Sequence, residues 1–273
     1  MSRPHTCFIQ SQSLQWHGAA AWGVPDGFLK TLSVDDSNDE CTAILRLPAN
    51  FAGSIVSPAG LALELLVLEG ALQVDGVLTT QHGYLFRIDA VSVPVLCRAE
   101  TTVLVMRNRP RQGDIDVAPA DTFAMRWLTG ADGSVTGKPL GNGLATKTLR
   151  FNAATGERSF LYAALAQHPP PAAMPGRFTH PMVEELFMLD GSYVFGDVGR
   201  MQRGAYVWWR EHVWHGPAGS VSGYHLFIRV LGGPLKNEFS TEPAAFSYHP
   251  PYRPVLPAAL AGKAHELTED ASW

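Results

Sequence analysis

The chain carries short apolar segments separated by polar turn residues. The segments are rich in valine, leucine and aromatic residues, and Gly, Asp and Pro lie between them. They include residues 43–47, 61–68, 84–88, 102–107, 159–165, 193–195 and 224–230. No stretch repeats apolar residues at the 3.6-residue period of a long helix between capping residues. Many short strands at this spacing are typical of an antiparallel sandwich or jelly roll, so the pattern predicts an all-β protein.

The same pattern occurs twice. Residues 27–32 match residues 144–149, with Lys30 and Lys147 offset by 117 positions, and residues 64–70 match residues 185–191 at an offset of 121. The extra residues fit an insertion in the proline-rich stretch near position 170. A duplication is therefore predicted. We place the two units at residues 1–110 and 121–232, separated by a polar linker at 107–120. An extension over 233–273 is expected to wrap a barrel or a partner subunit, with residues 262–273 helical or frayed.

Residues 177–217 carry the candidate chemistry. Alternate residues of a strand share a face, which places His180 and Glu184 on one side. A second strand is expected to bring His215 across from them. Two histidines and a carboxylate suit a divalent metal with open positions, here Fe, Zn, Mn, Ni or Cu. Glu184 is preferred to Glu185 because it keeps the strand parity of His180.

These residues resemble the two cupin motifs, H-x-H-x(3,4)-E-x6-G and G-x5-P-x-G-x2-H. His180, Glu184 and Gly191 match the second half of the first motif, while Gly204 and His215 match the second. The resemblance implies two cupin (jelly-roll) barrels in one chain, a bicupin, with His180, Glu184 and His215 as metal ligands.

Three motif positions of the second unit depart from the cupin pattern, and the first unit lacks the ligands. Phe178 replaces the first histidine, Arg210 the proline and His212 the glycine. The four-ligand site therefore becomes three, unless His212 or Glu185 substitutes. In the first unit the offset places Ala59, Leu63 and Pro94 at the ligand positions, so one metal ion per chain is expected.

Composition narrows the functional classes. The 273 residues are 46% hydrophobic and 17% charged, which suits a globular chain with a sizeable core. The net charge of −4 with scattered Lys and Arg gives no case for nucleic acid. The start of the chain has no long apolar signal segment, and no apolar run is long enough to span a bilayer. Three widely spaced cysteines suggest reduced thiols. We expect a cytoplasmic homodimer.

The residues around the candidate ligands leave several roles open. Phe178 and Met182 share the ligand face by parity and are either pocket lining for a partly apolar substrate or barrel core. Arg210 either grips a substrate carboxylate or enolate, or pairs with a neighbouring glutamate. His212 is a fourth ligand, an acid–base group or an exposed side chain. Arg210 and His212 are therefore the candidate catalytic residues.

Two functions compete at this stage. The first is a metal-dependent cupin enzyme, a dioxygenase acting on a small, partly apolar oxygenated substrate of the diketone or hydroxyketone type. The alternative is a non-catalytic metal-binding or ligand-sensing module, similar to the cupins of ChrR-type anti-sigma factors.

Overall fold

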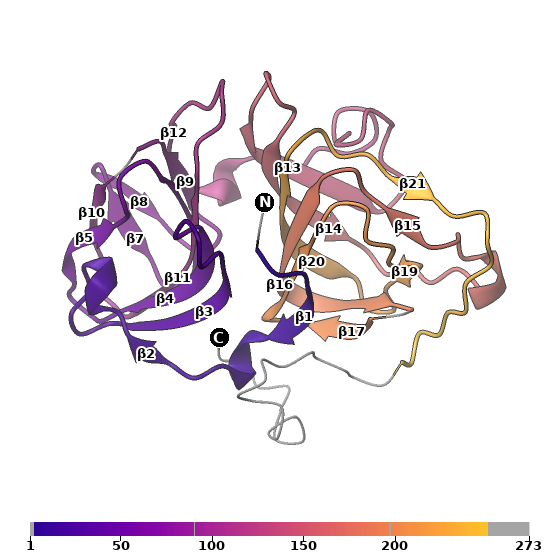
Figure 1. Cartoon of the computed structure of the whole chain (residues 1–273), viewed down its shortest axis with the longest axis horizontal. Coiled ribbons are helices and arrows are strands. Elements are labelled where there is room, and N and C mark those ends of the chain that lie inside the picture. The colour runs from indigo at the N-terminus through magenta and orange to yellow at the C-terminus, as the bar shows by residue number, and fades with distance from the viewer. Residues whose placement is uncertain (1–2, 90, 197, 251–272) are drawn as a thin grey trace. The chain divides into compact units, whose positions relative to one another are not determined.

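The structure is a computed structural model that describes residues 3–89, 91–196, 198–250 and 273. Strands dominate it, and its helices are single 3-10 turns. The all-β prediction is confirmed. The chain divides into two compact units, each described here by itself (Figure 1). Residues 14–126, with residues 3–4 and 273, form the first unit, and residues 5–13 with 127–250 form the second.

The first unit is built from two sheets. The larger has the order β12 (Val117–Ala120), β9 (Tyr84–Arg87), β6 (Ala62–Glu69), β11 (Thr101–Asn108), β4 (Cys41–Leu47), β3 (Phe28–Val34), β2 (His17–Gly18). The smaller has the order β5 (Ala52–Val56), β10 (Ser92–Leu96), β7 (Leu72–Val74), β8 (Val77–Thr79). Alternate side chains such as Leu63, Leu65 and Val67 of β6 meet Val93 and Val95 of β10 in one apolar core. This is the inward and outward alternation that two packed sheets require.

The second unit is organised on one eight-stranded sheet. Its main path is β1 (Thr6–Gln10), β18 (Ala205–Trp209), β16 (Val183–Phe195), β20 (Tyr224–Leu231), β14 (Arg158–Ala164), β13 (Leu144–Phe151). The far half of β16 also pairs with β17 (Gly199–Gln202) and β19 (Ala218–Gly219). A separate two-stranded sheet joins β15 (Phe178–Thr179) to β21 (Glu238–Phe239).

Both units place corresponding strands in the same order. The sequence β9-β6-β11-β4-β3 of the first unit matches β18-β16-β20-β14-β13 of the second. Buried polar pairs recur as well. The Tyr84 hydroxyl donates to Glu64 Oε1 at 2.7 Å, and the Tyr206 hydroxyl donates to Glu185 Oε1 at the same distance. The internal repeat of the sequence thus corresponds to a repeat of strand order.

The predicted boundaries at 1–110 and 121 differ from the structure at both ends of the first unit. Residues 5–13 belong to the second unit, because β1 pairs antiparallel with β18 and closes the edge of its sheet. The predicted linker contains a further strand, β12, which pairs with β9 and occupies the corresponding edge of the first unit. Residues 233–250, predicted as an extension, belong to the second unit. Except for Trp273, the helical or frayed end predicted over 262–273 lies outside the described residues.

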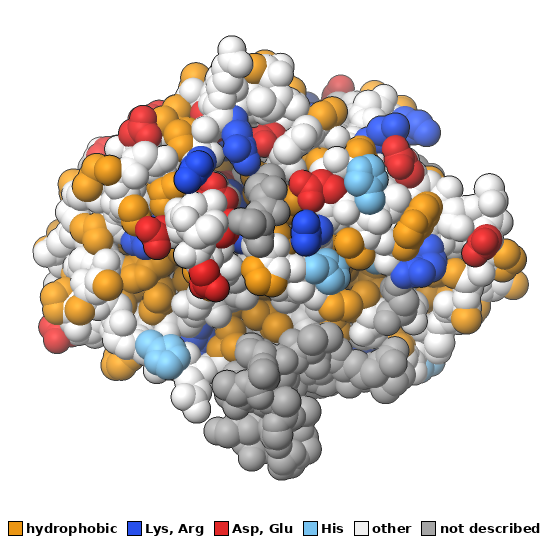
Figure 2. Space-filling view, in the orientation of Figure 1, with side chains coloured by type: hydrophobic (Ala, Val, Ile, Leu, Met, Phe, Trp, Pro, Cys, Tyr) orange, Lys and Arg blue, Asp and Glu red, His pale blue; other side chains and the backbone are white. Residues whose placement is uncertain are grey.

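The surface and the helices add two observations. Acidic and basic side chains are interspersed on the face shown in Figure 2, with no broad area of one sign among the residues described there. A search of the described residues finds no helix of the length and apolar character that a bilayer crossing demands.

Candidate metal centre

Three separate segments of the second unit bring His180, Glu184 and His215 together. His180 follows β15 directly, Glu184 is the second residue of β16, and His215 lies between β18 and β19. The backbones of Phe178 and His215 form an antiparallel bridge, with N–H···O distances of 2.8 and 2.9 Å. This bridge sets His215 across from the His180 segment, as the strand argument predicts.

The three side chains converge on one buried point. Their candidate ligand atoms all lie within 4.8 Å of one another. Nε2 of His180 is 3.3 Å from Glu184 Oε2, and Nε2 of His215 is 3.9 Å from the same oxygen. All three residues are buried. Among the described residues, this is the one cluster of His, Cys, Asp and Glu with such geometry.

Backbone carbonyls orient both imidazoles. His180 Nδ1 lies 3.0 Å from the Lys236 carbonyl oxygen, and His215 Nδ1 lies 3.0 Å from that of Val213. A carbonyl oxygen only accepts, so each Nδ1 carries the proton and donates it. The lone pair of each Nε2 then faces Glu184, which is the arrangement found in metal-ligating histidines. Nitrogen and carboxylate donors without thiolates fit a divalent metal at this point.

The Glu184 carboxylate and the His180 imidazole shift each other's pKa. Burial alone would raise the pKa of Glu184, but the charge and hydrogen bond of His180, with the charge of His215, hold that pKa below its usual value. Burial would lower the pKa of His180, yet Glu184, the Lys236 carbonyl and the Asn237 side chain raise it. Without a metal, these directions favour a protonated His180 imidazole paired with an ionised Glu184 carboxylate.

Glu185 points to the opposite face of β16. Its carboxylate accepts a hydrogen bond from Tyr206 and forms an ion pair with Arg229, and all three side chains are buried. This partner set occupies Glu185, so it is no fourth ligand in this structure. The preference for Glu184 therefore agrees with the strand geometry.

Arg210 and His212 lie outside the cluster. Both are exposed on the segment that follows β18. The His212 backbone N–H donates to the His180 carbonyl at 2.8 Å, and its φ of 61° turns the chain there. His212 thus fixes the turn through its backbone, while the residue itself is exposed.

Aromatic rings surround the imidazole of His215. The Phe178 ring lies 4.4 Å from it and the Trp209 ring 4.0 Å, measured between centroids. Gly216 permits the approach of Phe178, because a Cβ on this residue would come within 2.5 Å of that ring. Phe178 therefore fills the place where the cupin pattern has a further histidine, and it lines the cavity described next.

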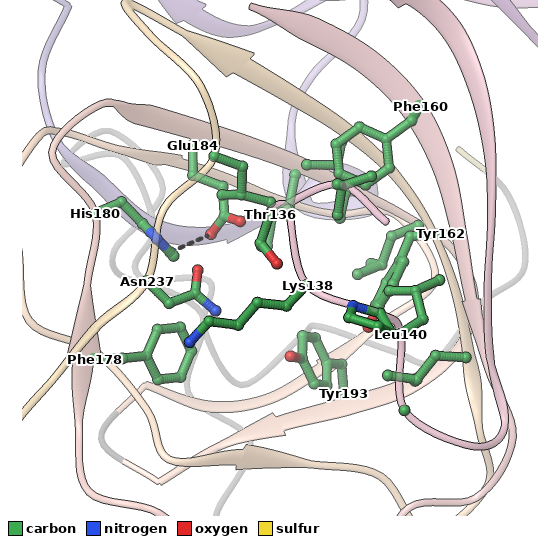
Figure 3. Close-up of a pocket in the computed structure, with 18 of the residues that line it drawn as sticks. Thr136, Lys138, Leu140, Phe160, Tyr162, Phe178, His180, Glu184, Tyr193 and Asn237 are labelled. Carbon is green, nitrogen blue, oxygen red and sulfur yellow. Dashed lines mark ion pairs between the residues drawn. The ribbon is translucent and has the colours of Figure 1, made fainter. Parts of the chain in front are cut away.

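A cavity of about 240 Å³ opens beside the cluster (Figure 3). Its polar lining comes from Thr136, Lys138, Tyr162, His180, Glu184, Tyr193 and Asn237. The remaining lining is mostly apolar and includes Phe178, Phe160 and Leu226. Met182, which lies in the bend between β15 and β16, packs in the hydrophobic core, the second of the two roles that the sequence left open for it.

Two tyrosines of the cavity, Tyr162 and Tyr193, are partly buried and form a group with the buried Tyr224. Tyr193 stacks on Tyr224 with ring centroids 4.2 Å apart, and Tyr162 lies 5.9 Å from Tyr224. Burial raises the pKa of Tyr162 to about 12, and burial also raises the pKa of Tyr193 and Tyr224. These phenols are neutral near pH 7, and those of Tyr162 and Tyr193 line the cavity.

Sequence reasoning missed Thr136, Lys138, Tyr162, Tyr193 and Asn237 as lining residues. Thr136 and Lys138 lie in an irregular, glycine-containing loop, and Asn237 lies just before β21. No periodic pattern marks them. For Asn237, the pairing of β21 with β15 next to His180 is the structural cause.

Comparison with protein-family models and with curated proteins finds no match. Solved structures do match. A putative dioxygenase from Nostoc punctiforme has a TM-score of 0.69 at 20% identity, covering 88% of this chain and 92% of that one. A cupin 2 conserved barrel domain protein from Leptotrichia buccalis has a TM-score of 0.50 at 6% identity, covering 76% and 89%. A mutant of Bacillus subtilis oxalate decarboxylase has a TM-score of 0.51 at 10% identity, covering 85% and 78%.

These likenesses establish the fold. The protein is an all-β chain with the cupin fold, as the sequence motifs predict. Its second unit carries a buried His–Glu–His cluster that could hold a metal ion.

Proposed function

We propose that the protein is a metal-dependent cupin enzyme in which His180, Glu184 and His215 hold one divalent metal ion. The reaction we assign is dioxygenation of a small, partly apolar oxygenated substrate of the diketone or hydroxyketone type. The observation that carries the proposal is the orientation of the two imidazoles. Each Nδ1 is engaged by a carbonyl, and each Nε2 is directed at a buried carboxylate.

The burial of Glu184 supports the proposal independently. A carboxylate loses several kcal/mol when it leaves water, unless a cation or several hydrogen bonds replace the water. Glu184 faces two histidine nitrogens that are themselves buried. A divalent ion among these three groups would compensate the carboxylate charge and use both nitrogen lone pairs.

The chain's own residues give the site its chemical character. Phe178 stands where a fourth protein ligand would be, so three ligands leave coordination positions for substrate oxygens and O2. When bound, an open-site Fe(II) activates oxygen and polarises substrate oxygens. Phe160, Leu226 and other apolar lining residues exclude water from that side. The neutral hydroxyls of Tyr162 and Tyr193 can donate hydrogen bonds to a bound substrate.

We further propose that the chain is a bicupin with one working site. The corresponding strand orders support the duplication, and so does a repeated cation–π pair. Lys30 lies 4.5 Å from the Trp16 ring in the first unit, and Lys147 lies 4.6 Å from the Trp127 ring in the second. Leu63, at the sequence counterpart of Glu184, is fully buried in an apolar core, which offers a metal no ligand there.

Metal analysis of protein purified without chelators tests the proposal. We expect about one metal ion per chain, lost in His215→Ala and retained in His212→Ala, the matched removal of an exposed imidazole from the same segment. Fe(II)-loaded protein should consume O2 with 2,4-pentanedione as the probe. Absence of metal from the wild type would refute the proposal. Tight metal binding without oxygen consumption for any diketone or hydroxyketone probe would favour the ligand-sensing alternative.

A further inference from the structure

Lys138 is the one lysine or arginine among the residues that line the cavity beside the His–Glu–His cluster. Its side chain extends across the cavity toward the end that holds Phe178 and Asn237 (Figure 3). Lys138 and Asn237 are both solvent-exposed, so this end of the cavity is its mouth. In the part of the chain that the structure describes, no salt bridge joins Lys138 to a carboxylate. The Lys138 ammonium group is therefore available to bind an anionic group of a ligand in the cavity.

The charges that line the cavity add up to a positive site once a metal is bound. Glu184 supplies the one carboxylate of the lining, and it faces the two histidines. With neutral imidazoles, a divalent ion and Glu184 leave a charge of about +1, and Lys138 raises it to about +2. Tyr162 and Tyr193 stay neutral because burial raises their pKa values. Such a cavity attracts anions.

The polar groups at the mouth are also matched to a carboxylate. A lysine ammonium offers three N–H donors and no acceptor. Asn237, which lies beside His180 in the same cavity, adds an amide that can donate a further hydrogen bond. The cavity volume of about 240 Å³ is below the usual range for drug-sized ligands, so the substrate is small.

We propose that the cavity selects small oxygenated carboxylates, such as 2-oxo acids, with Lys138 and Asn237 binding the carboxylate at the mouth. This rests on the proposed function and narrows its substrate class: one of the two neighbouring oxygenated carbons of a diketone-type substrate would be a carboxylate, and the remaining substrate oxygen would face the metal site. It also assigns to Lys138 the role that sequence reasoning offered to Arg210. Arg210 is exposed on the segment after β18 and is not among the cavity-lining residues.

A matched pair of probes tests the carboxylate directly. Pyruvate and 2,3-butanedione both carry two vicinal oxygens and have the same number of heavy atoms, but only pyruvate is an anion. Their dissociation constants are measured by calorimetry on metal-loaded wild type, Lys138→Met, Lys138→Arg and Arg210→Gln. Lys138→Met should weaken pyruvate binding about tenfold, the size of one charge-assisted hydrogen bond, and leave butanedione unchanged. Lys138→Arg should keep most of the affinity, and Arg210→Gln all of it.

Several results would overturn the inference. One is equal binding of pyruvate by Lys138→Met and wild type, and another is an equal loss for both probes in Lys138→Met. A third is the absence of pyruvate binding by the metal-loaded wild type at millimolar concentration. Failure of the proposed function is read separately, from metal content. If the protein holds no metal, the same comparison on metal-free protein still decides whether Lys138 recognises the carboxylate.

Discussion

The neighbouring glutamates of β16 allow a sharp separation of metal binding from folding. Glu184 faces His180 and His215, whereas Glu185 faces Arg229 and Tyr206 on the other side of the strand. We predict that Glu184→Gln empties the metal site and leaves the metal-free fold nearly as stable as the wild type. Glu185→Gln should retain the metal and destabilise the fold. The two substitutions are chemically identical and adjacent, so each is the control for the other.

The magnitudes follow from what each carboxylate contacts. Glu185→Gln leaves the buried Arg229 guanidinium without its anion, which costs about 3 kcal/mol. For a unit of this size, that corresponds to a fall in Tm of roughly 6 to 12 °C. Glu184→Gln removes the attraction to His180 but also removes a buried charge, and the two effects offset to within about 1 kcal/mol. Because Glu184→Gln removes a metal ligand, it should lower metal affinity by more than about a hundredfold.

The assay combines metal content with thermal unfolding, each measured with and without added metal. Metal at about a hundred times its Kd should stabilise wild type and Glu185→Gln by about 2.7 kcal/mol, and Glu184→Gln hardly at all. If Glu185→Gln loses the metal while Glu184→Gln keeps it, the facing assigned to β16 is wrong. If both variants keep the metal, neither glutamate is a ligand, and the remaining ligands beside His180 and His215 must come from other residues.

Three further outcomes test other parts of the structure. Phe178→His should add a fourth ligand and raise metal affinity at least about tenfold, measured as metal retention against a competing chelator. If retention is unchanged, residue 178 lies outside the coordination sphere. Phe8→Ala should destabilise the second unit by about 3 to 5 kcal/mol in denaturant unfolding, because Phe8 is fully buried, while Phe28→Ala, at a position 49% exposed, should change stability by less than about 0.5 kcal/mol. Burial lowers the pKa of His225 to about 4, so as the pH falls the unfolded chain binds a proton at this histidine before the folded chain does. The free energy of unfolding should therefore fall by at most about 3 kcal/mol between pH 6.5 and 4, and His225→Gln should make that fall smaller.

Much of the fold could be predicted because its signals are local. Alternation within short segments marks the strands, and the repeat at offsets of 117 and 121 reflects corresponding strands such as β4 with β14 and β9 with β18. The edge strand β1 could not be assigned in this way. Its pairing joins Thr6 to Trp208, which are distant in the chain, and a five-residue segment holds no information about which sheet it will close. For that reason the predicted first unit includes residues 5–13, which the structure groups with the second unit.

For the candidate site, too, local sequence signals predict some residues and not others. His180 and Glu184 are four residues apart, so local spacing already constrains their meeting, and the Phe178–His215 bridge adds the third group. Parity left Met182 open between pocket lining and barrel core, and the structure packs it in the core next to the bend at Pro181.

Arg210 lies where strand alternation no longer predicts the direction of a side chain. The strand β18 ends at Trp209, so neither alternation nor motif spacing says where the next side chain points, and the structure leaves it exposed. The cation that does reach the cavity comes from an irregular loop far from the ligands in sequence. A motif with fixed spacing allows metal ligands to be predicted from a single sequence. The side chains that contact a substrate depend on loop conformation, which the sequence pattern does not give. Recognition of the substrate is therefore where the three-dimensional structure adds most to the sequence.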